Sequence, residues 1–157
     1  MIRESFRLAD FDDTIRTVLE SGGEFRMYPR GRSMLPMLRE GVDSVVLVSP
    51  GETLEKGDIA LYLRADGHYV LHRVVDVTDG VYTMCGDNQV KKEPGITRDM
   101  IIGVVSRFYR GEKCADDSKP FYKFYKLIWK SFFIRRVYGK MRAAASYAKR
   151  KVKKIRK

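Results

Sequence analysis

The sequence has few of the residues that hold metal ions or form disulfides. Two cysteines, Cys85 and Cys114, and two histidines, His68 and His72, occur in 157 residues. Their spacing supplies neither a metal-ligand cluster nor a disulfide framework, so we expect free thiols, no metal and no cofactor. Cys85 should pack in the core as a small hydrophobic side chain.

Long apolar stretches are also missing. No run of about 18 uncharged apolar residues, the length that a bilayer-spanning helix needs, occurs in the chain. The first ten residues mix charged and apolar side chains and do not resemble a secretory signal peptide. We therefore expect a cytoplasmic protein, either free or peripheral on the inner face of the membrane.

Acidic residues are absent from the C-terminal part of the chain. Residues 118–157 carry 15 Lys and Arg and no Asp or Glu, whereas residues 1–117 carry 16 Lys and Arg against 20 Asp and Glu. A slightly acidic body with a strongly basic tail is typical of a protein whose tail meets a polyanion.

The remaining pattern predicts a mainly β fold. Apolar residues at helical spacing predict one short helix over 9–20, which Gly22 and Gly23 end. Short apolar runs between Gly and Asp turns then predict strands at 24–28, 44–49, 59–63, 69–77, 81–85 and 100–108. Their spacing is typical of a coiled β-sheet or barrel and not of a parallel α/β fold.

The same pattern divides the chain into four parts. We expect an N-terminal helix in residues 1–23, a β domain in 24–109, a polar linker in 110–119 and a basic amphipathic helical tail in 120–157. Apolar side chains recur among the basic ones of the tail at Phe121, Phe124, Ile128, Trp129, Phe132 and Phe133. This mixture favours an anionic lipid surface as partner, because nucleic acid would need only the charges.

One serine lies in a loop that should be stiff. Residues 31–38 read Gly-Arg-Ser-Met-Leu-Pro-Met-Leu. Pro36 fixes its own φ and favours extended geometry at Leu35, while Gly31 permits close approach of the backbone. Ser33 is therefore a candidate nucleophile, although a serine between glycine and proline is also an ordinary turn former.

A serine nucleophile works only with a base held within hydrogen-bond reach. His72 lies in an apolar strand-like run that would fix its rotamer, whereas His68 follows an Asp-Gly turn and should be solvated. Imidazole, with an unperturbed pKa near 6.5, takes up a proton readily at neutral pH. His72 is the better candidate, and its alternative role is a structural histidine on a strand.

Five short motifs carry a family resemblance. In chain order they are Ser33-Met-Leu-Pro, Gly57-Asp-Ile, His72-Arg-Val, Gly86-Asp-Asn and Asp99-Met-Ile-Ile-Gly-Val. The pattern resembles the serine peptidases of the type I signal peptidase and SOS-repressor clan over about residues 24–108. Because His72 stands where bacterial members have a lysine, the chain is similar to the archaeal and endoplasmic-reticulum branch. The resemblance implies a coiled all-β catalytic domain in which Ser33 attacks a peptide carbonyl.

The resemblance leaves two roles open. Asp87 is the first choice for the residue that orients His72, with Glu93 and Asp99 as alternatives, or the site is a serine–histidine dyad. Some relatives have a hydroxyl two residues before the nucleophile, where this chain has Gly31, so the backbone N–H of Ser33 is expected to stabilise the oxyanion.

The expected function is a serine endopeptidase. Signal peptidases of this type carry a membrane-spanning helix before the serine motif, and the residues before Ser33 are too charged for one. We therefore expect the substrate to be a leader peptide, a precursor or another polypeptide on the cytoplasmic side. The alternative is a non-catalytic β scaffold whose basic tail binds nucleic acid or membrane, although no helix-turn-helix or aromatic RNA-binding motif is visible.

Overall fold

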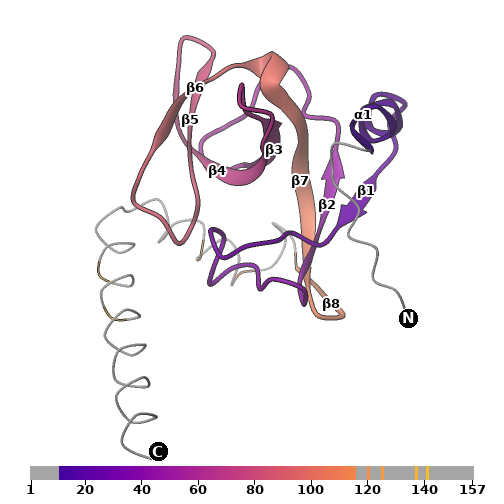
Figure 1. Ribbon diagram of the computed structural model, residues 1–157. Helices are drawn as coiled ribbons and strands as arrows, with labels where there is room; N and C mark the ends of the chain where they lie inside the picture. The colour runs from indigo at the N-terminus through magenta and orange to yellow at the C-terminus, as the bar shows by residue number, and fades with distance from the viewer. Residues whose placement is uncertain (1–10, 116–119, 121–124, 126–136, 138–140, 142–157) are drawn as a thin grey trace, which may run out of the picture.

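The protein is mainly β, as predicted (Figure 1). The computed structural model describes residues 11–115 and the single positions 120, 125, 137 and 141. Within them one α-helix, α1 (Asp12–Glu20), precedes eight strands. The strands are β1 (Phe25–Met27), β2 (Ser44–Val48), β3 (Ile59–Leu63), β4 (Tyr69–Thr78), β5 (Val81–Cys85), β6 (Glu93–Ile96), β7 (Ile101–Arg110) and β8 (Lys113–Ala115).

All eight strands form one antiparallel sheet. Its order is β1-β2-β7-β3-β4-β5-β6, and β8 pairs with β7. The long β7 joins the two halves, because β2 pairs along one edge of it and β3 along the other (Figure 1). The sheet is not closed, so the barrel form of the fold prediction is wrong. In the described part of the chain, β1 and β6 are its two ends.

Two segments predicted as irregular contain strands. Residues 86–98, which lie between the strands predicted at 81–85 and 100–108, include β6; Pro94 and Gly95 hide the alternation of this strand, and a strand at a sheet edge tolerates them. A one-turn 3₁₀ helix, η2 (Arg98–Met100), follows it. The expected linker over 110–119 begins with the end of β7 and a tight turn at Gly111, whose φ is +62°, that leads into β8. The predicted tail, 120–157, lies outside the described residues except at positions 120, 125, 137 and 141.

The core consists of two apolar clusters. In the first cluster, Ile15 and Leu19 of α1 pack with residues of β2 and β3. The second cluster includes Tyr62 of β3 and Met84 of β5. Side chains of β3 point alternately to the two clusters: Leu61 belongs to the first, and its neighbours Ala60 and Tyr62 belong to the second. No helix among the described residues is long and apolar enough to cross a membrane.

A buried ion pair joins β4 to the loop after β5. Arg73 Nε and Nη2 donate to the two carboxylate oxygens of Asp87 at 2.8 Å each, and the side chains are 1% and 0% exposed. Arg73 Nη1 donates to the carbonyl of Gly57 at 2.7 Å, and the hydroxyl of Tyr125 donates to Asp87 at 3.0 Å. Because the pair is bidentate and has further partners, it fixes the loop relative to β4.

Breaking this pair from one side should destabilise the protein strongly. Asp87→Asn or Arg73→Met leaves a charge buried without its counterion, at a cost of about 3–5 kcal/mol in the free energy of unfolding. The double variant Arg73→Met/Asp87→Leu should lose less than either single variant. Urea unfolding followed by circular dichroism measures all three, and Arg107→Met, which breaks an exposed pair with Glu24, is the control expected to change little. Equal effects of Arg73→Met and Arg107→Met would contradict this role.

Candidate active site

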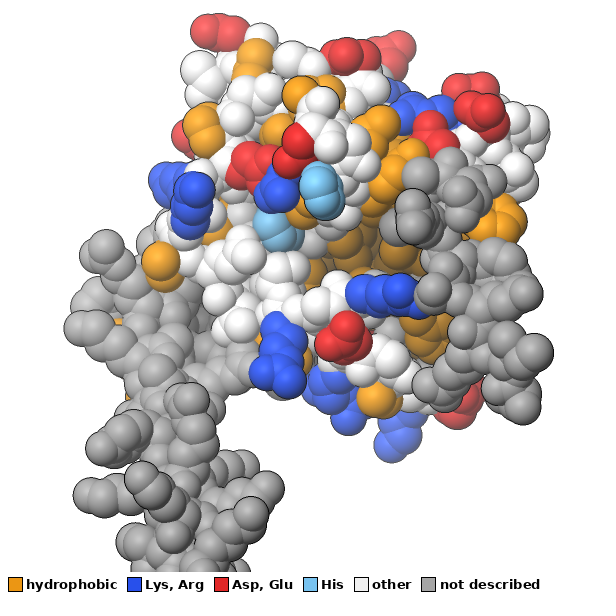
Figure 2. Space-filling view, in the orientation of Figure 1, with side chains coloured by type: hydrophobic (Ala, Val, Ile, Leu, Met, Phe, Trp, Pro, Cys, Tyr) orange, Lys and Arg blue, Asp and Glu red, His pale blue; other side chains and the backbone are white. Residues whose placement is uncertain are grey.

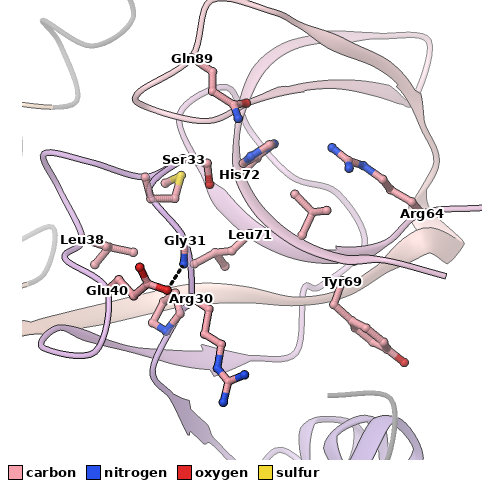
Figure 3. A pocket seen from close by; sticks show the side chains of 13 residues that line it. Arg30, Gly31, Ser33, Leu38, Glu40, Arg64, Tyr69, Leu71, His72 and Gln89 are labelled. Carbon is pink, nitrogen blue, oxygen red and sulfur yellow. Dashed lines mark hydrogen bonds between the residues drawn. The ribbon is translucent and has the colours of Figure 1, made fainter. Parts of the chain in front are cut away.

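Ser33 and His72 line the same small pocket. Its volume is about 240 Å³, and Figure 3 shows the serine hydroxyl beside the imidazole. Both histidines are visible on this face of the molecule, next to an apolar hollow (Figure 2). The pocket is lined by Pro29, Arg30, Gly31, Ser33, Met34, Leu38, Glu40, Arg64, Tyr69, Val70, Leu71, His72 and Gln89.

Hydrogen bonds from the Gly86-Asp-Asn motif hold the serine loop in place. The backbone N–H of Asn88 donates to the carbonyl of Ser33 at 2.7 Å, and its side-chain amide donates to the carbonyl of Arg32 at 3.0 Å. Met34 and Met37 are buried beneath the loop. The loop is therefore anchored at Arg32 and at Ser33, on both sides of the candidate side chain.

Gly86 allows the serine loop and the imidazole to approach each other. A Cβ atom at this position would lie 2.7 Å from the carbonyl oxygen of Ser33 and 3.0 Å from Nε2 of His72. Both groups therefore pack against one point of the backbone, and Nε2 is the nitrogen on the serine side. No hydrogen bond joins the Ser33 hydroxyl to His72 in the described residues, and such bonds often shorten only when a substrate binds.

His72 is buried and neutral. The residue is 4% exposed, on β4. The pKa of its imidazole is lowered to about 4, chiefly by burial; the charge of Arg64 acts in the same direction, and Glu93 and Asp87 oppose it. At neutral pH His72 can therefore accept a proton, as a general base must.

The other imidazole nitrogen of His72 faces a tyrosine and a carboxylate. Nδ1 lies 3.2 Å from the hydroxyl of Tyr62 and 3.9 Å from a carboxylate oxygen of Glu93. Ala60 is the partner of His72 in the β3–β4 register, so Tyr62 is the diagonal neighbour on the same face. Tyr62 donates to Glu93 at 2.8 Å, and Arg64 binds both oxygens of Glu93.

The carboxylates considered for the orienting role lie in three different places. Glu93 reaches the Nδ1 side of His72, on β6. Asp87 directs both oxygens to Arg73. Asp99 is exposed on η2 and accepts a hydrogen bond from Thr97.

Other predicted residues have clear positions. His68 is exposed in the turn between β3 and β4, with Nδ1 3.1 Å from Asp66, as expected of a solvated side chain. Cys85 is fully buried. Within residues 11–115, no backbone hydrogen bond from the N–H of Ser33 is found. In that part of the chain no three His, Cys, Asp or Glu side chains gather to hold a metal ion.

The sequence interpretation missed Tyr62, Arg64 and Arg73. The sequence did indicate a role for Tyr62, because this residue lies in the apolar run 59–63 and a buried tyrosine hydroxyl needs a hydrogen-bond partner. It also indicated one for Arg73, since an arginine inside an apolar strand requires a counterion.

A methyl group at Gly86 should disturb the site more than the fold. Gly86→Ala forces the carbonyl of Ser33 and the ring of His72 apart, so if Ser33 is a nucleophile its acylation by an activated ester should slow by on the order of 100-fold. The matched control is Gly103→Ala, whose Cβ would lie 2.8 Å from Leu19 Cδ1, away from the pocket. It should lower the melting temperature and retain acylation. Wild-type acylation in folded Gly86→Ala would contradict the geometry.

The comparisons with known proteins add no family assignment. No family model matches the chain, and neither the curated proteins nor the solved structures give a match. Function must therefore be inferred from the chain's own motifs and from the geometry of Ser33, His72 and their neighbours.

Proposed function

We propose that the protein is a serine endopeptidase with Ser33 as nucleophile and His72 as general base. One observation carries the proposal: a serine on an anchored loop and a buried neutral histidine line one pocket, with Nε2 on the serine side. The five motifs that resemble the signal peptidase clan support the same assignment. In the Gly86-Asp-Asn motif, Gly86 leaves room for the serine loop and the imidazole, and the N–H of Asn88 binds the Ser33 carbonyl.

The proposed reaction proceeds through an acyl-enzyme. Ser33 Oγ forms a bond to the scissile carbonyl carbon while its proton moves to Nε2 of His72. The backbone N–H of Ser33 stabilises the oxyanion, and the carboxamide of Gln89 on the pocket wall offers a second donor. His72 then protonates the leaving amine, and a water molecule releases the acyl group by the same steps.

The proposed substrate is a leader peptide, a precursor or another polypeptide on the cytoplasmic side. Met34, Leu38 and Leu71 give the pocket an apolar wall next to Ser33. A pocket of about 240 Å³ suits one small or medium apolar side chain near the scissile bond.

Peptide cleavage should require Ser33 and His72 but not His68. Incubation of the protein with a mixed peptide library, followed by mass spectrometry, should reveal cleaved bonds in wild type and in His68→Ala. Ser33→Ala and His72→Ala should each reduce cleavage by several orders of magnitude. If neither variant loses activity, or if His68→Ala is the inactive one, the assignment is wrong and the scaffold function takes its place.

The pH dependence of kcat/KM should have its acidic limb near pH 4. Protonation of Nε2 removes the base, so activity should fall about tenfold per pH unit below the pKa of His72 and stay level above it. Burial is the main cause of this low pKa. Of the charged groups that face the ring, Arg64 also lowers the pKa, whereas Glu93 and Asp87 raise it. A limb near 6.5 would show a solvated imidazole and contradict the burial argument.

We propose an anionic membrane surface as the partner of the basic tail, residues 120–157. At about 1 kcal/mol per basic residue near such a surface, a third of the 15 basic residues within 118–157 would give useful affinity. Replacing basic residues tests this proposal better than truncating the tail, because the hydroxyl of Tyr125 donates to Asp87 and that contact must be kept. Replacing the seven basic residues within 149–157 by glutamine should therefore weaken co-sedimentation with anionic vesicles and leave peptide cleavage intact.

The aromatic residues decide between lipid and nucleic acid. Insertion of Trp129 and Phe133 into the lipid interface should leave part of the vesicle binding resistant to salt, and Trp129→Ser/Phe133→Ser should remove that part. If vesicle binding vanishes at modest salt while nucleic acid binds more tightly under the same conditions, the tail is a nucleic-acid arm.

A further inference from the structure

We infer that Tyr62 is a positioning residue that, together with Glu93, holds His72 in the tautomer with the proton on Nδ1, so that the unprotonated Nε2 faces Ser33. The catalytic consequence rests on the proposed peptidase function. The tautomer itself is a property of the folded chain and can be measured without any substrate.

Glu93 can only accept hydrogen bonds. Arg64 Nε donates to one oxygen of Glu93 and Nη2 to the other. Burial alone would raise the pKa of Glu93, but the hydrogen bonds from Arg64 and Tyr62 hold it below its ordinary value. Glu93 is therefore ionised at neutral pH and has no proton to donate.

The hydroxyl of Tyr62 has a single proton, and two neighbours could accept it. Burial and the hydrogen bond to Glu93 raise the pKa of the phenol, so it stays protonated. Its oxygen lies 2.8 Å from Glu93 Oε2 and 3.2 Å from His72 Nδ1. A carboxylate can only accept, so the phenol proton goes to Glu93 and the phenol oxygen is left as an acceptor toward the ring.

The acceptor at Tyr62 fixes the tautomer of the imidazole. Nδ1 must donate to Tyr62, because two acceptors facing each other would leave a buried polar contact unsatisfied. A neutral imidazole has one N–H, so Nε2 has a lone pair. Nε2 lies close to Gly86, the residue against which the serine loop also packs, because a Cβ at this position would be 3.0 Å from Nε2. The chain Arg64–Glu93–Tyr62–His72 therefore aims the base at the nucleophile.

A phenol between the carboxylate and the ring has a chemical advantage. A carboxylate bonded directly to Nδ1 would favour the charged imidazole in the resting protein. Here the Glu93 oxygen stays 3.9 Å from Nδ1, which is within ion-pair distance once His72 takes the serine proton. Glu93 thus stabilises the imidazolium when it forms while His72 remains neutral beforehand.

Nitrogen-15 NMR of the imidazole tests the tautomer directly. The full-length His68→Ala background leaves His72 as the sole histidine signal, and the two ring nitrogens have distinct shifts when one carries a proton and the other does not. At pH 7 the N–H signal should belong to Nδ1. Tyr62→Phe should shift the population toward the Nε2–H form, because the acceptor at Nδ1 is gone.

Tyr82→Phe is the matched control. Tyr82 is also a buried tyrosine of the second core cluster, and its hydroxyl accepts a hydrogen bond from the Leu54 N–H at 3.2 Å. Its removal deletes a buried hydroxyl without touching His72. Tyr82→Phe should therefore leave the His72 tautomer and the turnover unchanged, even if it lowers the melting temperature as much as Tyr62→Phe.

Kinetics on a cleaved peptide add the functional readout. Tyr62→Phe should lower kcat by on the order of 10- to 100-fold with little change in KM, since it alters the base and not the peptide contacts. An Nε2–H tautomer in wild type, or an unchanged tautomer and kcat in Tyr62→Phe, would overturn the inference. A correct tautomer in a protein that cleaves no peptide would uphold the positioning geometry and overturn the peptidase function.

Discussion

The distances in the candidate site depend on the buried ion pair between Arg73 and Asp87. His72 directly precedes Arg73, and Gly86 directly precedes Asp87, so the bidentate pair holds the imidazole against the glycine. Asn88, the next residue, binds the Ser33 carbonyl and brings the serine loop to the same point. One charged contact thus aligns β4, the loop after β5 and the nucleophile loop.

Two buried charged or polar arrangements surround His72, and they contribute in different ways. The Arg73–Asp87 pair has a large desolvation cost and serves mainly to specify geometry, since apolar side chains of similar volume often give equal stability. We propose that the Tyr62–Glu93 pair sets the tautomer of the ring, whereas burial sets its charge. Burial outweighs the nearby carboxylates and keeps the pKa of His72 near 4, so the base is neutral at physiological pH.

The sequence predicted the parts that depend on local pattern. The strands at 59–63 and 81–85 follow from apolar runs between Gly and Asp turns. Ser33 and His72, which short motifs indicate as a pair, line one pocket. β6 was missed because Pro94-Gly95 shows no alternation, and the open sheet because closure depends on long-range pairing. Tyr62 was missed because only the β3–β4 register makes it a diagonal neighbour of His72.

The central claim is that the anchored Ser33 is a nucleophile activated by His72. The most direct measurement is covalent labelling with a serine-directed phosphonate, followed by mapping of the modified peptide by mass spectrometry. The claim predicts a single adduct on Ser33 that disappears in His72→Ala and persists in His68→Ala. Absence of an adduct on the folded wild-type protein, or an adduct on Ser33 that forms equally fast without His72, would contradict it.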